Sequence, residues 1–520
     1  MVGQHDRRRR PHRWQHRRQG LLHRTVRRAA PWSGSGRQSG PDRLFPTMSL
    51  PIKFGTDGWR GIIADTFTFE NVRHAAQAAA GYFRTVHETV EGTEPAVFVG
   101  YDGRFQSSRF ARISAEVLAG NGLRVLLMDR PYPTPYVSFE VRRRRFAGGV
   151  VITASHNPPM FNGFKVKAHY GGSATPGITA QIEARLGKAE IRTSDANIET
   201  AEPEVHYFDH LRSLVDWDRI AKSKLKAVVD SMHGSGGRIL EEMLRPTSCT
   251  VETIRGDIDP LFGGVHPEPM MPQLEPLSRR VVETRSHVGL ATDGDADRVG
   301  VVDETGQYVN TLQLLGLLIL HLHRNKGWRG AVARTYSQSL IIPRIASALG
   351  LVTYECPIGF KNIGEMMLEQ EILIGGEESG GIGVSRHLPE RDGIFINLLM
   401  LDLLATSGKT CTQLIRDMWA EFGEFHYGRR DLHIPAAAAQ AVVETLRTSP
   451  PATFAGRRVQ EVGRLDGSKV FLDGDAWILF RQSGTEPLLR VYCEAPTQTA
   501  VDGVIAAGLE FVEQIRRRGV

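Results

Sequence analysis

The chain has 520 residues, which is too long for a single hydrophobic core and predicts three or four domains of about 100 to 200 residues each. Apolar residues make up 41% and charged residues 23% of the sequence, values that are typical of a soluble globular protein. The formal charge of +6 does not indicate a body that binds nucleic acid, because residues 1–47 carry a net charge of +10 and the remainder carries −4.

Cysteine usage and hydropathy exclude two further classes. The four cysteines are far apart and form no Cys-x-x-Cys pair, so the sequence predicts neither a zinc site nor a disulfide framework. A reducing, cytoplasmic location is therefore the default expectation. The longest apolar run, residues 312–322, is interrupted by polar residues and is too short to span a bilayer, so we expect no membrane segment.

Residues 1–47 are rich in Arg, Gly, Pro and Gln and lack an apolar period, so we expect them to be disordered. Three interpretations compete: a transit peptide, a nucleic-acid-binding arm, or upstream sequence translated ahead of a start at Met48. The last is favoured, because Met48 directly precedes the first ordered motif and the prolines disfavour an amphipathic targeting helix.

The first folded domain is expected to span residues 48–204. It opens with the glycine-rich stretch 54–61, whose Arg60 could present a bidentate fork to phosphate; a glycine turn with a surface arginine is the competing interpretation. Helical and strand patterns then alternate, which is typical of βαβ units in a mostly parallel sheet. The expected helices are 69–84 and 107–119, and the expected strands are 96–100, 124–128 and 148–152.

A polar loop, Thr-Ala-Ser-His-Asn-Pro-Pro at 153–159, follows the last of these strands. It places the hydroxyl of Ser155 just past a strand end, where it could act as a nucleophile. Lys165 follows soon after and is a candidate to assist proton transfer. An Asn-Pro turn with an exposed lysine is the alternative, and this stretch alone does not decide between the two.

A second domain, 205–310, contains the sequence Asp-Gly-Asp-Ala-Asp-Arg between two apolar runs. Asp293, Asp295 and Asp297 can turn their carboxylates toward one point, where their mutual repulsion favours a bound cation. Oxygen ligands without Cys or His favour Mg²⁺ over zinc. An EF-hand calcium loop has the same aspartate spacing, but Arg298 stands where its sharp turn needs glycine, and the flanks are strand-like.

A third domain, 311–430, carries a loop with Lys361, followed by a strand, 372–376, that runs into Glu-Glu-Ser-Gly-Gly at 377–381. Glu377 and Ser379 on this flexible loop could recognise adjacent sugar hydroxyls, although a solvated turn is the alternative. The last domain, 431–520, groups donors suited to a phosphate dianion: Arg481, Ser483, the backbone N–H of Gly484 and Thr485. A Ser-Gly turn between two strands is the alternative.

Together these loops resemble those of the α-D-phosphohexomutase family, the phosphoglucomutases and phosphomannomutases, from about Pro51 to the C-terminus. The resemblance implies an α/β fold with three similar mixed α/β sheet domains, a smaller C-terminal α+β domain and an active site at their central junction. It also implies that Ser155 carries a phosphate, which completes a Mg²⁺ site formed by the three aspartates.

The resemblance assigns further roles to residues of this chain. The residues expected to be catalytic are Ser155, Lys165, Arg60 and His156. The residues expected to bind substrate are Arg298, Lys361, Glu377, Ser379, His387, Arg391, Arg481, Ser483, Gly484, Thr485 and Arg490. Several phosphomannomutase-type members have a histidine where Gly381 stands here, which leaves the general base open, with His387 and Arg391 as nearby candidates.

The implied activity interconverts hexose 1-phosphate and hexose 6-phosphate through hexose 1,6-bisphosphate, in a monomer or dimer. Glucose 1-phosphate is the expected best substrate, because Glu378 and Gly381 replace the glutamine and histidine typical of phosphoglucosamine mutases. Phosphomannomutase and phosphoglucosamine mutase activities are alternatives within the family. A sugar phosphatase and a nucleic-acid-binding protein acting through residues 1–47 are the rival hypotheses.

Overall fold

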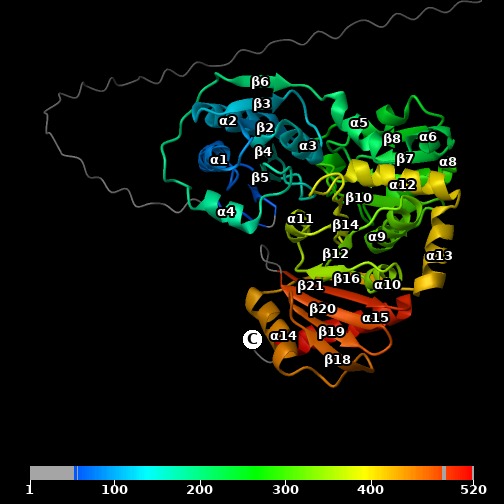
Figure 1. The fold of residues 1–520 in the computed structure, drawn as a ribbon. Helices are drawn as coiled ribbons and strands as arrows, with labels where there is room; N and C mark the ends of the chain where they lie inside the picture. Colours follow the sequence, from blue (N-terminus) through cyan, green and yellow to red (C-terminus); the bar gives the residue numbers. More distant parts are fainter. Residues whose placement is uncertain (1–51, 56, 483–487, 518–520) are drawn as a thin grey trace, which may run out of the picture. The chain divides into compact units, whose positions relative to one another are not determined.

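The computed structural model describes residues 52–55, 57–482 and 488–517 (Figure 1). The chain divides into two units, Met1–Ser49 and Leu50–Val520, and the fold below is that of the second unit. The prediction of disorder for residues 1–47 falls outside the described residues.

The first domain contains β1 (Trp59–Ile62), α1 (Phe69–Thr89), β2 (Glu94–Tyr101), α2 (Ser107–Gly120), β3 (Arg124–Met128), α3 (Thr134–Arg144), β4 (Phe146–Ile152), β5 (Phe161–Ala168), α4 (Pro176–Glu183) and β6 (Ile198–Ala201). Its sheet has the order β1-β5-β4-β2-β3-β6. Strands β4, β2, β3 and β6 run parallel to one another, whereas β5 is antiparallel to both of its neighbours, β4 and β1. Glycines in β4 allow close helix packing, since a Cβ at Gly148 would lie 2.2 Å from Phe83 of α1.

The second domain contains α5 (Val205–Ser213), α6 (Trp217–Lys222), β7 (Lys226–Asp230), α7 (Ile239–Leu244), β8 (Thr250–Ile254), α8 (Glu275–Thr284), β9 (Val288–Thr292), β10 (Val299–Asp303) and β11 (Tyr308–Val309). Its sheet has the order β11-β10-β9-β7-β8. β9 runs parallel to β7 but antiparallel to β10. The aspartate motif therefore forms the connection between two adjacent buried strands.

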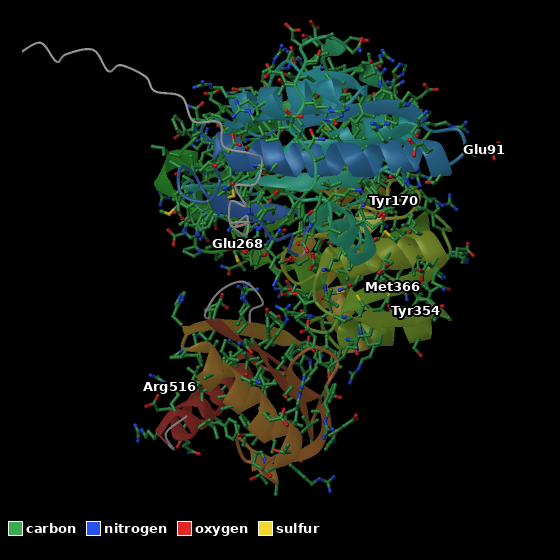
Figure 2. All side chains as sticks on the ribbon, turned by 90° about the vertical axis from the view of Figure 1, so that its left-hand side faces the viewer. Glu91, Tyr170, Glu268, Tyr354, Met366 and Arg516 are labelled. Atoms are coloured by element: carbon green, nitrogen blue, oxygen red, sulfur yellow. The ribbon has the colours of Figure 1, made fainter. Side chains whose placement is uncertain are left out.

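The third domain contains α9 (Thr311–Leu320), a π-helical turn (His321–Asn325), β12 (Ala331–Thr335), α10 (Ile341–Ala348), β13 (Thr353–Cys356), α11 (Phe360–Glu369), β14 (Ile372–Gly376), β15 (Ile382–Val384), α12 (Gly393–Ser407) and α13 (Cys411–Phe422). Its sheet has the order β13-β12-β14-β15. Tyr354 of β13 and Met366 of α11 pack against a local core under this sheet (Figure 2).

Helix α12 crosses from the third domain to the second. Apart from Asn397 and Asp402 it is apolar on every side, and it is buried from Gly393 to Leu404. It packs against α6, β9 and β10 of the second domain as well as α9 and β15 of its own (Figure 1). Within the described residues no single helix is long and apolar enough to cross a membrane, and α12 and α13 meet that test only as a pair bent by 81°.

The C-terminal domain contains β16 (His426–His433), α14 (Ala436–Thr448), β17 (Thr453–Phe454), β18 (Arg457–Gly463), β19 (Ser468–Leu472), β20 (Ala476–Gln482), β21 (Leu488–Ala495) and α15 (Gln498–Arg517). Its antiparallel sheet has the order β16-β21-β20-β19-β18-β17 and encloses a separate core with α14 and α15. β16 pairs along its whole length with β21 and so belongs to this sheet.

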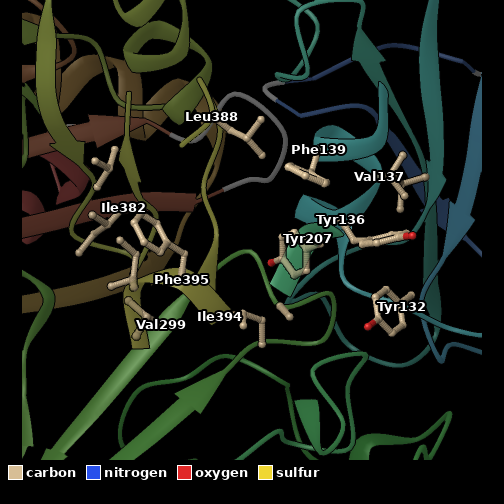
Figure 3. Packing of buried hydrophobic residues seen from close by; sticks show 14 of the residues in the cluster. Tyr132, Tyr136, Val137, Phe139, Tyr207, Val299, Ile382, Leu388, Ile394 and Phe395 are labelled. Atoms are coloured by element: carbon tan, nitrogen blue, oxygen red, sulfur yellow. The ribbon is translucent and has the colours of Figure 1, made fainter. Parts of the chain in front are cut away.

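The first three domains share one continuous hydrophobic core. Figure 3 shows Tyr207 of α5 close to Tyr136 and Phe139 of α3, with Ile394 and Phe395 of α12 nearby. The ring centroid of Tyr207 lies 5.6 Å from that of each α3 aromatic residue. Three mixed α/β sheet domains with a smaller α+β domain confirm the predicted fold class.

Candidate active site

Ser155 lies in the loop after β4, at the carboxyl end of a strand in the middle of the first sheet. Its φ of +53° is in the left-handed region, which a residue with a side chain adopts only when the surroundings enforce it. The side chain is buried, and its Oγ donates a 2.6 Å hydrogen bond to Oδ2 of Asp293. The serine loop and the aspartate motif are therefore in direct contact.

Arg104, at the carboxyl end of β2, holds the serine loop in shape. Its buried guanidinium donates to Asp102 and to four carbonyl oxygens of the loop and the start of β5, those of Ser155, Asn157, Pro158 and Phe161. Asp102 also accepts a 2.6 Å bond from the hydroxyl of Thr153. This buried pair fixes the backbone on both sides of Ser155.

The three aspartates between β9 and β10 converge as predicted, with one carboxylate oxygen of each within 4.8 Å of the others. Burial, together with the charges of Asp295 and Asp297, raises the pKa of Asp293 well above its usual range. In the described part of the chain, Oδ1 of Asp295 and Oδ1 of Asp297 are buried and have no hydrogen-bond partner. Crowded carboxylates with unsatisfied oxygens are what a hard divalent cation requires.

Lys165 lies on β5, and its buried ammonium contacts the same cluster. Nζ lies 2.9 Å from Asp295, 3.0 Å from Asp297 and 2.7 Å from Asp57. Burial opposes the charge of Lys165, but these carboxylates outweigh burial and raise its pKa. Lys165 is thus a charged partner of the cluster.

His156 and Arg60 flank the serine on the side of a cavity of about 200 Å³. Burial and the charges of Arg298 and Arg60 hold the pKa of His156 well below its usual range, so its ring is neutral. Nδ1 of His156 lies 3.4 Å from Oγ of Ser155, and Arg60 donates a 2.5 Å bond to the side chain of Asn157. Ser155 itself is not among the residues that line the cavity.

The cavity brings together most of the residues predicted to bind substrate. Those lining it are Arg298, Lys361, Glu377, Ser379, Arg391, Arg481 and Arg490. Among the described residues, seven positively charged side chains and four carboxylates surround it, which suits an anionic ligand with several hydroxyl groups. Ser483, Gly484 and Thr485 lie outside the described residues.

The structure explains the glycine at position 381. A Cβ there would lie 2.5 Å from Cδ of Arg391 and 2.9 Å from Oε2 of Glu377, so a larger residue would require these two side chains to move. Burial raises the pKa of Glu377 to about 7, although Arg391 lowers it. Arg391 also donates to Asp57 and Asp297 and so links the cavity to the aspartate cluster.

Three arginines project into the cavity from the C-terminal sheet. Arg481 of β20 and Arg490 of β21 are directly opposite each other, a repulsive pairing unless anions separate the charges. Arg481 donates to Asp466, while Arg429 of β16 forms a two-fold contact with Asp431. Each of these two guanidinium groups is oriented by a carboxylate of its own domain.

His387 does not occupy the position predicted for it. It is buried outside the cavity lining, where its Nε2 faces Asp392 at 2.8 Å and its Nδ1 faces His210 at 3.0 Å. The loop turns His387 inward while Arg391 points to the cavity. A direct contact between His387 and a ligand therefore does not fit the structure.

Sequence reasoning missed three contributors, Arg104, Arg429 and Asp57. The stretch Tyr-Asp-Gly-Arg at the carboxyl end of β2, a strand adjacent to β4, was a usable signal, because neighbouring parallel strands end at the same edge. Arg429 lies within a strand that no glycine-rich loop adjoins, so the sequence around it did not indicate a functional residue.

A buried serine against a carboxylate cluster, beside a cavity rich in guanidinium groups, defines a multi-domain α/β enzyme with an anion-binding active site. Family models of phosphoglucomutase/phosphomannomutase match all four domains: α/β/α domain I at residues 51–192, domain II at 205–306, domain III at 310–422 and the C-terminal domain at 441–509. The chain belongs to the phosphoglucomutase/phosphomannomutase family.

Individual relatives cover nearly the whole chain. A crystal structure assigned as a phosphomannomutase of Thermus thermophilus is 35% identical, with a TM-score of 0.79, and covers 90% of this chain and 100% of its own. A phosphoglucomutase/phosphomannomutase of Thermococcus kodakarensis is 27% identical over 89% of this chain and 98% of its own. A phosphoglucosamine/phosphogalactosamine mutase of Sulfurisphaera tokodaii is 27% identical over 88% of this chain and 99% of its own.

Proposed function

We propose that this chain is a phosphohexomutase that interconverts glucose 1-phosphate and glucose 6-phosphate, with Ser155 as the phosphate carrier. The contact between Ser155 and Asp293 carries the proposal, because it places a hydroxyl nucleophile against a cluster with unsatisfied carboxylate oxygens. His156, the next residue, lines a cavity rich in arginine. Phosphoryl transfer needs a nucleophile, charge compensation and donors for phosphate together.

Mg²⁺ is the cation that fits the cluster best, since every available ligand is an oxygen. Asp293, Asp295 and Asp297 would hold it, and it would offset negative charge on the transferring phosphoryl group. An N-acetylphosphoglucosamine mutase of Aspergillus fumigatus, which shares 15% identity, has been crystallised in complex with GlcNAc-6P and magnesium.

The chain's own residues account for the remaining steps. The bond between phosphorus and Oγ of Ser155 breaks as a bond forms to the free hydroxyl of the hexose phosphate, which yields hexose 1,6-bisphosphate. The hydroxyl proton goes to a nearby group, with neutral His156 and a carboxylate beside Lys165 as candidates. The bisphosphate then turns over in the site, and its other phosphate bonds to Oγ of Ser155 as the bond to the hexose oxygen breaks and that oxygen takes up a proton.

The arginines of the C-terminal sheet would bind the phosphate that is not being transferred. Arg429, Arg481 and Arg490 reach the cavity from a different domain than the one that carries Ser155, so the two ends of a hexose bisphosphate would have separate binding groups. Glu377 and Ser379 line the same cavity and would bind the sugar hydroxyls.

The preference for glucose rests on the loop 377–381. Glu378 accepts a 2.5 Å bond from Ser337, and a side chain at position 381 would have to displace Arg391 and Glu377, which supports a loop of the glucose type over the histidine-containing phosphoglucosamine type. Mannose 1-phosphate is the proposed second substrate and glucosamine 1-phosphate a poor one.

Initial rates with glucose 1-phosphate, mannose 1-phosphate and glucosamine 1-phosphate test this proposal, with inorganic phosphate measured in the same reactions. We expect the highest kcat/KM with glucose 1-phosphate and little phosphate release. A higher kcat/KM with glucosamine 1-phosphate would overturn the substrate preference. Stoichiometric phosphate release without isomerised product would identify a phosphatase instead.

A further inference from the structure

Asp466 joins two walls of the cavity that belong to different domains. It lies in the turn between β18 and β19 of the C-terminal domain. One of its oxygens, Oδ2, accepts a 2.9 Å bond from Nε of Arg481 and a 2.9 Å bond from the backbone N–H of Ile358 in the third domain. A single carboxylate oxygen thus holds both a guanidinium and a loop.

Both partners of Asp466 reach the cavity. Arg481 lines it from β20, and Ile358 begins the segment Ile358-Gly359-Phe360-Lys361, all four residues of which line it. Gly359, with φ +128°, leads directly into α11, so the position of Ile358 sets where the first turn of that helix presents Lys361.

Other polar contacts between described residues also join these two domains, but their interdomain partners lie outside the cavity lining. Lys469 donates to the carbonyl oxygen of Tyr336 at 2.8 Å, Glu494 accepts from the N–H of Leu340 at 2.8 Å, and Arg344 pairs with Asp475 at 2.7 Å. An apolar cluster of Tyr336, Trp477, Leu479 and Tyr492 joins the domains as well, and Ile358 packs against it. Asp466 is therefore well placed to control the distance between two cationic groups of the site.

We infer that Asp466 is a positioning residue for phosphate recognition: by binding Arg481 and Ile358 together, it sets the spacing of Arg481 and Lys361 so that one phosphorylated ligand contacts both. This inference rests on the proposed function only for the identity of the ligand. Asp466 acts through its two hydrogen-bond partners and does not touch the ligand.

If Asp466 acted only through its negative charge, its removal would have the opposite effect on phosphate binding. The side chain of Asp466 is 21% exposed and that of Arg481 15%, so the carboxylate partly neutralises the arginine. If neutralisation were its whole effect, removing the charge would strengthen phosphate binding in both Asp466→Ala and Asp466→Asn. If Asp466 positions its partners, Asp466→Ala weakens binding, while Asp466→Asn keeps an acceptor oxygen and restores much of it.

The experiment compares Asp466→Ala, Asp466→Asn and a control, Asp475→Gly. The control removes the salt bridge to Arg344 between the same two domains, and its φ of +55° suits glycine. For Asp466→Ala we expect KM for glucose 1-phosphate to rise about ten- to hundredfold, with kcat within about threefold, since hydrogen bonds to charged groups are lost. Asp466→Asn should recover most of the loss, and Asp475→Gly should match the wild type.

Two further measurements separate this inference from the proposed function. Hydrogen exchange of the segment that contains Ile358, without ligand, should be faster in Asp466→Ala and unchanged in Asp475→Gly. Calorimetric binding of glucose 6-phosphate should weaken in parallel with the change in KM. An inactive wild type that shows these differences would refute the mutase assignment but not the role of Asp466. Unchanged exchange at Ile358, or tighter binding in Asp466→Ala, would overturn the positioning role.

Discussion

The hydroxyl of Ser155 lies 2.6 Å from Oδ2 of Asp293, a residue 138 positions further along the chain. This bond joins the serine loop of the first domain to the carboxylate cluster of the second. Neither half of the site is complete alone, so changes at either residue are expected to affect phosphoryl transfer while leaving most of each domain intact.

Ser155→Ala should abolish turnover and leave the fold intact. Removal of the nucleophile should lower kcat by at least about a thousandfold, while the melting temperature changes by only a few degrees. Mutase assays and thermal unfolding provide the measurements. Ser114→Ala, which removes a buried hydroxyl bonded to Phe110 away from the site, is the control and should keep its activity. Substantial mutase activity in Ser155→Ala would rule out this serine as the carrier.

Removal of divalent cations should inactivate the enzyme, and Mg²⁺ should restore more activity than Ca²⁺, which prefers longer bonds and more ligands. Asp295→Asn should need more Mg²⁺ for half-maximal activity, because it alters a carboxylate with an unsatisfied oxygen. Asp129→Asn, outside the cluster, is the control and should follow the wild-type titration curve. Full activity in excess chelator would contradict the metal assignment.

Arg104→Lys should destabilise the serine loop despite preserving the charge. A lysine cannot donate to Asp102 and four carbonyl groups at once, so we expect a loss of about 2 to 4 kcal/mol in the free energy of unfolding, together with reduced kcat. Denaturant unfolding and mutase assays measure the two effects. Arg112→Lys, on the exposed face of α2, should change neither, and equal behaviour of the two variants would contradict the proposed role of Arg104.

Glu377→Ala should cost about 2 to 4 kcal/mol in transition-state binding, because sugar hydroxyls would lose a partner in a closed site. The measurement is kcat/KM with glucose 1-phosphate. Glu369→Ala, at the end of α11, is the control. A loss of less than threefold would remove Glu377 from the set of sugar-binding residues.

His210 should make stability depend on pH in a defined window. Burial and the neighbouring His387 lower the pKa of His210 to about 4. Between this value and about 6.5, the usual pKa of histidine, the unfolded chain binds a proton that the folded chain does not. The stabilising contribution of His210 to the free energy of unfolding is therefore present above about pH 6.5 and is lost as the pH falls toward about 4.

The variant His210→Gln tests this dependence. Between about pH 7.5 and about pH 5, the melting temperature of the wild type should fall further than that of His210→Gln. The melting temperature of His87→Gln should change as that of the wild type does. Parallel curves for the wild type and His210→Gln would show that the surroundings of His210 do not favour its neutral form.

The sequence predicted those parts of the site that consist of short motifs. Ser155 and the three aspartates were found because polar residues followed buried strands, and Arg60 and Glu377 were found in glycine-rich loops. His387 was misplaced because sequence proximity to Arg391 does not reveal which way each side chain of a loop turns. The position of Asp466 against Ile358 depends on how two domains meet, and no local pattern encodes that contact.

Alternating helical and strand patterns predicted βαβ units in the first domain, and the resemblance to the family implied the four-domain arrangement. Neither predicted the course of α12. Its composition, apolar on all sides except for Asn397 and Asp402, indicates burial and does not identify the partner. This helix starts at Gly393, whose N–H donates to Ala296 inside the aspartate motif, and it covers strands of the preceding domain.

The boundary between the second and third domains is therefore not a boundary of independent folding. A fragment that ends near residue 310 would retain the aspartate motif but would expose the apolar surface of β9 and β10 that α12 covers, and Ala296 would lose its backbone partner. Synthesis must continue past residue 407 before the second domain can bury its sheet. The cation site therefore matures late, although its aspartates are already present in the first three hundred residues.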